Sequence, residues 1–135
     1  MSSSEPIPGL RRQYHFRASP RGLLAWDVHR LIRLAEGLPV QAVPLSDIRE
    51  IDEPYWFGGG SDVATCRRVA KHAQLIQEAD LAYPILLCHE GRIMDGMHRV
   101  LKALNEDSPT VQAKQFLEPI EPDHVGCDPQ SLPDD

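Results

Sequence analysis

Hydrophobic residues recur with helical spacing in two stretches of the chain, residues 24–36 and residues 61 or 62 to 79. In both stretches an apolar residue follows every three or four positions, which is typical of an amphipathic helix. The stripe expected to be buried in the first helix is Leu24, Val28, Leu31, Ile32 and Ala35. The corresponding stripe of the second helix is Val63, Cys66, Val69, Ala70, Ala73 and Ile76.

Short β-prone runs predict a sheet. Residues 40–45 form one run, which Pro44 limits to a sheet edge or a strand end. Residues 85–89 are typical of a buried strand, Glu90 and Gly91 of a tight turn, and residues 92–94 of the returning strand of a hairpin. After Asp95 and Gly96, a helix is predicted over residues 97–106, burying Val100, Leu101 and Leu104, and a last strand over residues 110–116. The pattern predicts a small mixed α/β (α+β) fold with packed helices and an extra N-terminal helix.

The two ends of the chain differ in composition from the middle. Seven of the twelve prolines lie in residues 1–20 or 119–135. We therefore expect an irregular arm over residues 1–20, the N-terminal helix within residues 21–39, one folded domain over residues 40–117, and an acidic, proline-rich, disordered tail over residues 118–135.

The formal charge of −6 is distributed unevenly. Residues 118–135 contain six acidic residues and no lysine or arginine, and the rest of the chain carries fourteen acids and fourteen bases. This balance disfavours binding to nucleic-acid phosphates. Six arginines between residues 11 and 33 keep a role with DNA or RNA open.

Several protein classes are not expected. No run approaches eighteen apolar residues, so no membrane span is predicted, and the first residues lack the basic and apolar pattern of a signal peptide. Three cysteines are too few for a disulfide scaffold, which favours a reducing, cytoplasmic location. The histidines and cysteines lack paired metal-ligand spacing, so no metal site is predicted.

The junction between the hairpin and the following helix carries the most informative chemistry, Asp95-Gly96-Met97-His98-Arg99. The first amides of a helix have no intrahelical partner and favour an anion such as a phosphate. His98 and Arg99 could hold phosphate oxygens, and Asp95 could accept a hydroxyl proton or hold a metal ion. The alternative is that Asp95 only caps the helix, with His98 and Arg99 solvated.

Residues 84–104 resemble the core of the ParB/sulfiredoxin fold, and residues 43–53, 66–79 and 110–116 are similar to its opening strand, first helix and closing strand. The resemblance covers roughly residues 40–117. It implies that Gly96, Met97, His98 and Arg99 bind the phosphates of a nucleotide (ATP, ADP or CTP). Sulfiredoxins have a reactive cysteine where this chain has Met97, which cannot form a thiolate, so sulfiredoxin activity is not expected.

Within this superfamily the motif is most similar to the Asp-Gly-His-His-Arg motif of free-serine kinases, matching it at four of five positions. The resemblance implies phosphoryl transfer to a small hydroxyl compound, with Asp95 as the base and Glu53 orienting the substrate or a magnesium ion. Met97 replaces one imidazole of the motif. Asp52 competes with Glu53 for its role, and either acid could instead be a solvated turn residue.

A second function remains open, a non-catalytic, nucleotide-gated module that binds DNA or a protein partner and is related to chromosome-partitioning proteins. It would need the phosphate site but not both acids. Three adjacent aromatic residues, Tyr55, Trp56 and Phe57, could stack on a base or pack in the core. The glycines at positions 58–60 lack the lysine of a Walker loop and predict either a lid or a linker.

Overall fold

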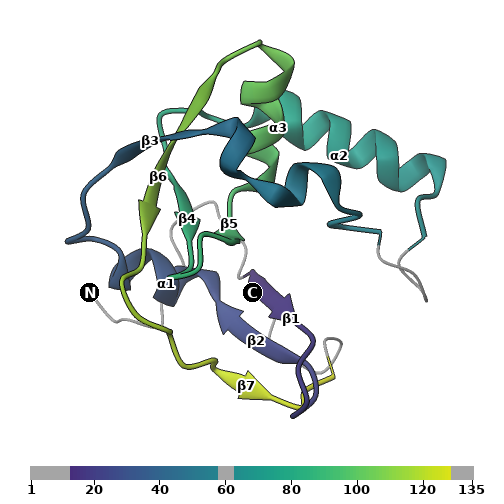
Figure 1. Ribbon diagram of the computed structural model, residues 1–135. Coiled ribbons are helices and arrows are strands. Elements are labelled where there is room, and N and C mark those ends of the chain that lie inside the picture. Colours follow the sequence, from purple (N-terminus) through teal and green to yellow (C-terminus); the bar gives the residue numbers. More distant parts are fainter. Residues whose placement is uncertain (1–12, 58–62, 129–135) are drawn as a thin grey trace.

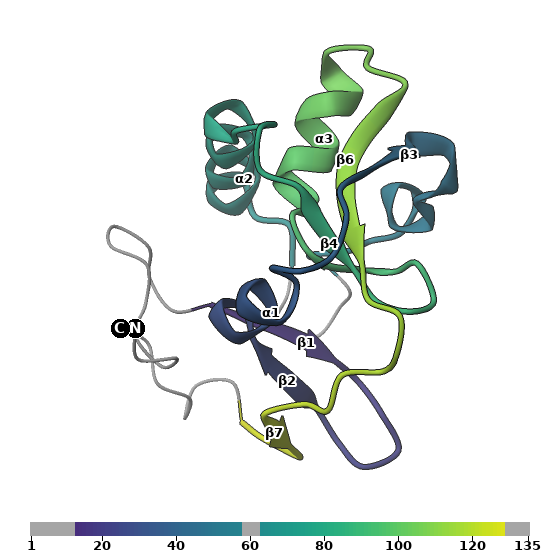
Figure 2. The same cartoon turned by 90° about the vertical axis from the view of Figure 1, so that its left-hand side faces the viewer.

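Two β-sheets and three α-helices make up the computed structural model, which describes residues 13–57 and 63–128 (Figure 1). The predicted mixed α+β class is therefore confirmed. Figure 2 shows an upper part with α2, α3 and the larger sheet, and a lower part with α1 and the smaller sheet. The glycines at positions 58–60 and the predicted helix start at residue 61 or 62 lie outside the described residues. Across the described ranges no helix has the length and apolar character of a membrane span.

The larger sheet has the strand order β3-β6-β4-β5. Its strands are β3 (Gln41–Pro44), β4 (Ile85–Leu87), β5 (Ile93–Asp95) and β6 (Thr110–Gln115). β4 and β5 form the predicted antiparallel hairpin, β6 runs parallel to β4, and β3 pairs with β6 at the edge, where Pro44 was expected. Two short 3₁₀ turns, Leu45–Asp47 and Arg49–Asp52, follow β3.

The smaller sheet has the order β1-β2-β7, with antiparallel pairs of β1 (Tyr14–Arg17), β2 (Leu24–Asp27) and β7 (His124–Val125). Two expectations are corrected here: the arm expected to be irregular over residues 1–20 contains the strand β1, and the tail expected to be disordered over residues 118–135 contains the short strand β7. The physical reason is pairing with β2, which lies between β1 and β7 in the sheet. The indole Nε1 of Trp26 also donates to the carbonyl of Ile120 at 2.7 Å.

The first helix, α1 (Val28–Leu34), is shorter than its apolar spacing predicts. Asp27 is its N-cap and accepts a hydrogen bond from the amide of His29 at 2.9 Å. Residues 24–27 therefore belong to a strand, although their apolar positions continue the helical pattern. An aspartate at the N-cap is a common start signal, and it outweighs the spacing here.

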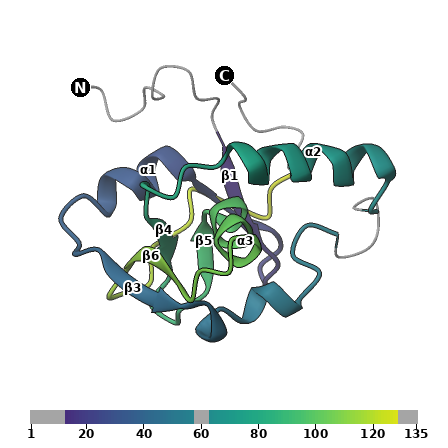
Figure 3. The same ribbon diagram turned by 90° about the horizontal axis from the view of Figure 1, so that it is seen from above.

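The second helix, α2 (Cys66–Glu78), uses a different face from the predicted one. Thr65 caps it, and none of its thirteen residues is buried. The expected stripe is mostly exposed: Cys66, Val69, Ala70 and Ala73 face solvent. The half-buried residues are His72, Leu75 and Ile76, so α2 rests on its neighbours through the face that carries His72. Figure 3 shows α2 at the edge of the molecule, beside α3 (Met97–Asn105).

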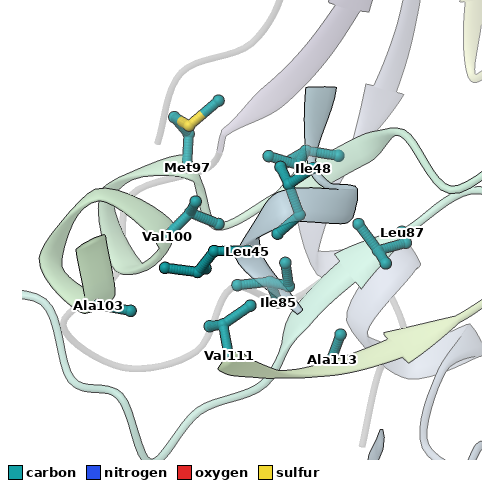
Figure 4. Packing of buried hydrophobic residues seen from close by; sticks show 10 residues of the cluster. Leu45, Ile48, Ile85, Leu87, Met97, Val100, Ala103, Val111 and Ala113 are labelled. Carbon is teal, nitrogen blue, oxygen red and sulfur yellow. The ribbon is translucent and has the colours of Figure 1, made fainter. Parts of the chain in front are cut away.

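The core lies on both sides of the larger sheet because alternate residues of β4 point to opposite faces. Ile85 and Leu87 pack with α3 in the cluster shown in Figure 4, which also contains Leu45, Ile48, Ile93, Met97, Val100, Ala103, Val111 and Ala113. Leu86 and Cys88 belong to a second cluster with Trp26, Leu31, Ala35, Met94 and Phe116. Val100 is buried as predicted, Leu101 only partly, and Leu104 is exposed, because Ala103 faces the core instead.

Candidate functional site

Gly96 forms the corner between β5 and α3, and its backbone has φ +112°. A Cβ atom there would lie 2.6 Å from Cγ2 of Ile85, so β4 leaves no room for a side chain. Gly96 is also the N-cap of α3, and no side chain makes a capping bond. The predicted role of Asp95 as a cap is therefore wrong. The N-terminal end of this nine-residue helix is left open to other partners.

A cavity of about 750 Å³ lies at this end of α3. Its walls come from α1, the C-terminal end of α2, the segment before β4, and the β5–α3 corner. The structure brings four of the predicted site residues to it: Asp95, Gly96, His98 and Arg99. Met97 points elsewhere, because its side chain is 4% exposed and belongs to the core. The helix of the predicted motif thus has one residue in the core and two at the cavity.

Asp95 and Arg99 form an ion pair in the cavity wall. Nη2 of Arg99 lies 2.8 Å from Oδ2 of Asp95, and Nη1 donates to the carbonyls of Tyr83 at 3.2 Å and Pro84 at 2.7 Å. The side chain of Arg99 is 19% exposed and that of Asp95 is 16% exposed, so the expectation that Arg99 is solvated is wrong. Arg99 therefore braces the segment before β4 as well as placing a positive charge at the cavity.

The second predicted acid does not reach this cavity. Glu53 is 42% exposed and pairs with Arg92, with 2.7 Å between Oε1 and Nη2. Glu53 is absent from the cavity lining, and Asp52 is exposed. The buried acid of this segment is Glu50, three residues before Glu53, and the sequence did not indicate it. Glu50 is 3% exposed, and its Oε2 accepts a hydrogen bond from the amide of Ile93 at 2.7 Å.

Glu50 is buried among apolar residues, and the sequence gives little indication of this burial. Oε1 of Glu50 is buried and has no hydrogen-bond partner among the described residues. Burial and the negative charges of Glu50 and Asp95 raise the pKa of Tyr55 to about 12, so its phenol stays protonated. The only sequence signal for Glu50 is its place between Ile48 and Ile51, which pack on the core.

Beside the cavity, the imidazoles of His72 and His98 stack side by side on the indole of Trp56. The ring centroids of His72 and His98 lie 3.9 and 4.5 Å from that of Trp56 and 5.1 Å from each other. If the two imidazoles lay on opposite faces of the indole, their centroids would be separated by nearly the sum of their distances to Trp56. The observed separation of 5.1 Å is much shorter, so both imidazoles cover the same face. Nδ1 of His72 and Nε2 of His98 share a hydrogen bond of 2.9 Å. The sequence indicated Trp56 and His98 but not the contribution of His72 from α2.

The environment of the two stacked imidazoles, His72 and His98, favours their neutral form. Burial is the largest cause that lowers the pKa of His98 to about 4, followed by the electrostatic cost of a second positive charge beside the His72 imidazole and by the charge of Arg99. Burial and Arg68 lower the pKa of His72. Each neutral imidazole has one donor and one acceptor nitrogen, so one of the two facing nitrogens can donate to the other, which matches the hydrogen bond observed.

We expect the free energy of unfolding to decrease as the pH falls from about 6.5 to about 4. His98 takes up a proton near its ordinary value of 6.5 when unfolded but only near 4 when folded, so protons favour the unfolded chain in this window. His15, whose pKa burial lowers to about 3, acts in the same direction. Urea unfolding at pH 7.5, 5.5 and 4.5 measures the effect.

The matched variants are His98→Gln and His89→Gln, since His89 is exposed. His98→Gln should make stability less dependent on pH, whereas His89→Gln should keep the wild-type dependence. The same slope in both variants would rule out His98 as a source of the pH dependence.

The remaining walls bring residues that the sequence did not indicate. Lys114 of β6 lines the cavity, and its Nζ donates to the carbonyl of Ala35 at the end of α1 at 3.1 Å. His29 of α1 lines it as well and is 5% exposed. In the described parts of the chain, no three metal-ligating side chains come together.

Comparisons with protein-family models, with curated proteins and with solved structures found no match. The geometry of the cavity and the chemistry of the residues around it are therefore the basis for assigning a function.

Proposed function

We propose that this chain binds a phosphate-bearing small molecule, with a nucleotide such as ATP, ADP or CTP as the leading class, in the cavity at the N-terminal end of α3. The observation that carries the proposal is an uncapped helix end that lies on the cavity. The unpaired amides and the positive end of the helix dipole favour an anion at this place.

The charged side chains around the cavity are of both signs, because Arg99 and Lys114 are positive and Glu78, Asp80 and Asp95 are negative. The support for an anionic ligand therefore comes from the helix end and from these two bases, not from the net charge of the lining. Arg99 neutralises Asp95, so that this carboxylate repels an anion less than a free one would. Lys114 adds a positive charge from a different wall. Because the terminal nitrogens of Arg99 already bond to Asp95 and to two carbonyls, the helix amides and Lys114 are the main phosphate contacts in this proposal.

A ParB/sulfiredoxin-like fold over residues 40–117 is part of the proposal. Its support is the order of the elements: an edge strand, a helix, a buried hairpin and a helix that begins at Met97, directly after Gly96. The resemblance implies this order, with the phosphate site where β5 meets α3.

Phosphoryl transfer to a small hydroxyl compound is the second candidate, and the place of Asp95 in the cavity wall favours it. Glu53 gives it no support, because it pairs with Arg92 outside the cavity lining. In this reading Asp95 alone accepts the hydroxyl proton. Asp95→Asn should then retain nucleotide binding and abolish turnover, as measured by nucleotide consumption with candidate hydroxyl compounds.

A nucleic-acid partner has less support. Arg17 donates to the carbonyl of Ile93 at 3.4 Å, and Arg30 pairs with Asp123 at 3.2 Å. Two of the arginines that kept this function open are thus engaged inside the molecule.

Calorimetry and thermal unfolding with ATP, ADP and CTP, each with and without magnesium, test the proposed binding. A ligand that binds only the folded chain adds about 2.7 kcal/mol of stability at a hundred times its Kd, so the Tm should rise. Lys114→Ala should raise Kd about tenfold, which corresponds to one charged contact of about 1.4 kcal/mol.

Lys71→Ala is the matched control, because Lys71 is exposed on α2 and is not part of the cavity lining. It should bind like the wild type. The absence of a Tm shift and of binding heat with all three nucleotides would contradict the proposed function.

A further inference from the structure

Helix α1 supplies a wall of the cavity that the phosphate chemistry leaves unexplained. Val28, His29 and Ile32 of α1 and its C-cap residue Ala35 all line the cavity, and they lie outside residues 40–117. Figures 1 and 2 show α1 below β4. The cavity is thus enclosed by an element that the resembling segment does not contain.

The two sides of the cavity differ in chemistry. Asp95, Arg99 and the open helix end lie on the α3 side, whereas α1 contributes apolar side chains and a single polar one, His29. Leu86 of β4, Leu75 of α2 and the C-cap residue Ala79 extend this apolar surface, and the acidic residues Glu78 and Asp80 line the cavity next to Ala79. An inorganic phosphate would occupy the α3 side and leave the apolar wall without a contact, because burying apolar surface needs an apolar or aromatic partner.

His29 is the polar group within this wall, and its hydrogen bonding is incomplete. Its Nδ1 is buried and has no hydrogen-bond partner among the described residues, since Oδ1 of Asp27 lies 3.7 Å away and accepts from the backbone amide instead. A buried polar atom without a partner costs about 1–3 kcal/mol. Packing alone would therefore favour an apolar residue here. Because Nδ1 has almost no accessible surface, a ligand in the cavity would have to contact the imidazole through Nε2.

We propose that α1 holds the non-phosphate body of the ligand, that this body is an aromatic heterocycle such as a nucleobase, and that His29 is the polar contact that distinguishes one ring system from another. The inference rests on the proposed phosphate site and deepens it. A flat ring packs on Val28 and Ile32 while its edge groups bond to the imidazole. The phosphates then extend to the end of α3.

The first experiment compares ATP and CTP with tripolyphosphate, which carries the same phosphate chain without a ring. Calorimetry on the whole chain should give a Kd for the better nucleotide at least about tenfold lower than that for tripolyphosphate, which corresponds to about 1.4 kcal/mol. Equal affinity would overturn the role of α1 and leave the phosphate site in place. No binding of any of the three would instead remove the proposed function.

The second experiment uses His29→Leu, which replaces the incompletely bonded imidazole by an apolar side chain. We expect this variant to unfold at the wild-type urea midpoint or above it. Its Kd for the preferred nucleotide should rise about tenfold and its preference between ATP and CTP should narrow, while its Kd for tripolyphosphate stays within about twofold.

Equal weakening of nucleotide and tripolyphosphate would overturn the assignment of His29 to the ring. His29→Gln, which keeps a donor and an acceptor, is the companion variant and should retain part of the preference. If both variants unfold at a much lower urea concentration than the wild type, His29 is a structural residue and the inference fails.

Discussion

Replacing Gly96 with alanine should lower the free energy of unfolding by about 3–5 kcal/mol, because two costs add at one position. The backbone of Gly96 has φ +112°, a conformation that an L side chain adopts only with strain. The added Cβ would also lie 2.6 Å from Cγ2 and 2.9 Å from Cβ of Ile85. Ile85 is fully buried in β4 and cannot move aside without disturbing the core.

Urea unfolding of Gly96→Ala and of Gly37→Ala gives a matched comparison. No atom lies within 4 Å of a Cβ built at Gly37, so its replacement should change stability by less than about 1 kcal/mol. The loss for Gly96 is a large share of the 5–15 kcal/mol that is usual for a domain, so part of the variant should be unfolded at 37 °C. Similar midpoints for the two variants would contradict this account of the β5–α3 corner.

The hairpin and the helix that follows it could be predicted because their signals are local. Glu90 and Gly91 mark the turn between two apolar runs, and Gly96 marks the corner. The amide of Gly91 bonds to the carbonyl of Cys88 at 2.9 Å, which closes the turn within four residues. Asp95, His98 and Arg99 could be placed together for the same reason, since they are neighbours in the chain.

The smaller sheet could not be predicted, because its pairing joins distant parts of the chain. Leu24 of β2 pairs with Val125 of β7, about a hundred residues later. Strands of two to four residues show too little alternation to be recognised alone. The composition of the two ends indicated irregular structure, because composition does not reveal whether a segment pairs with a strand elsewhere in the chain.

Helical spacing also left open which side of α2 is covered. The helix has two apolar faces, and the contacts of His72 with Trp56 and His98 select the one that rests on the molecule. The cavity wall was missed for a similar reason: His29 and Lys114 come from α1 and β6, and only the tertiary structure places them opposite Asp95. Local chemistry thus predicted one side of the site.

The second large effect is expected at Glu50, three residues before the acid that the resemblance indicated. Glu50→Ala should lower the free energy of unfolding by about 2–4 kcal/mol, because the buried amide of Ile93 loses the carboxylate that accepts its hydrogen bond at 2.7 Å. Arg92, whose Nε lies 3.6 Å from Oε2, also loses a nearby opposite charge.

Glu53→Ala is the control that separates the two acids. Its pair with Arg92 is short, at 2.7 Å, but both side chains are about a third exposed or more, and such surface pairs contribute about 0–1 kcal/mol. Urea midpoints should therefore fall in the order wild type, Glu53→Ala, Glu50→Ala, with Glu50→Gln between the last two because an amide oxygen still accepts from Ile93. An equal loss for both alanine variants would mean that the Arg92 pair is as important to the hairpin as the buried carboxylate. The order expected here instead makes Glu50 the acid that ties the turn after β3 to β5, and Glu53 a surface residue whose position in the sequence resembles that of a catalytic one.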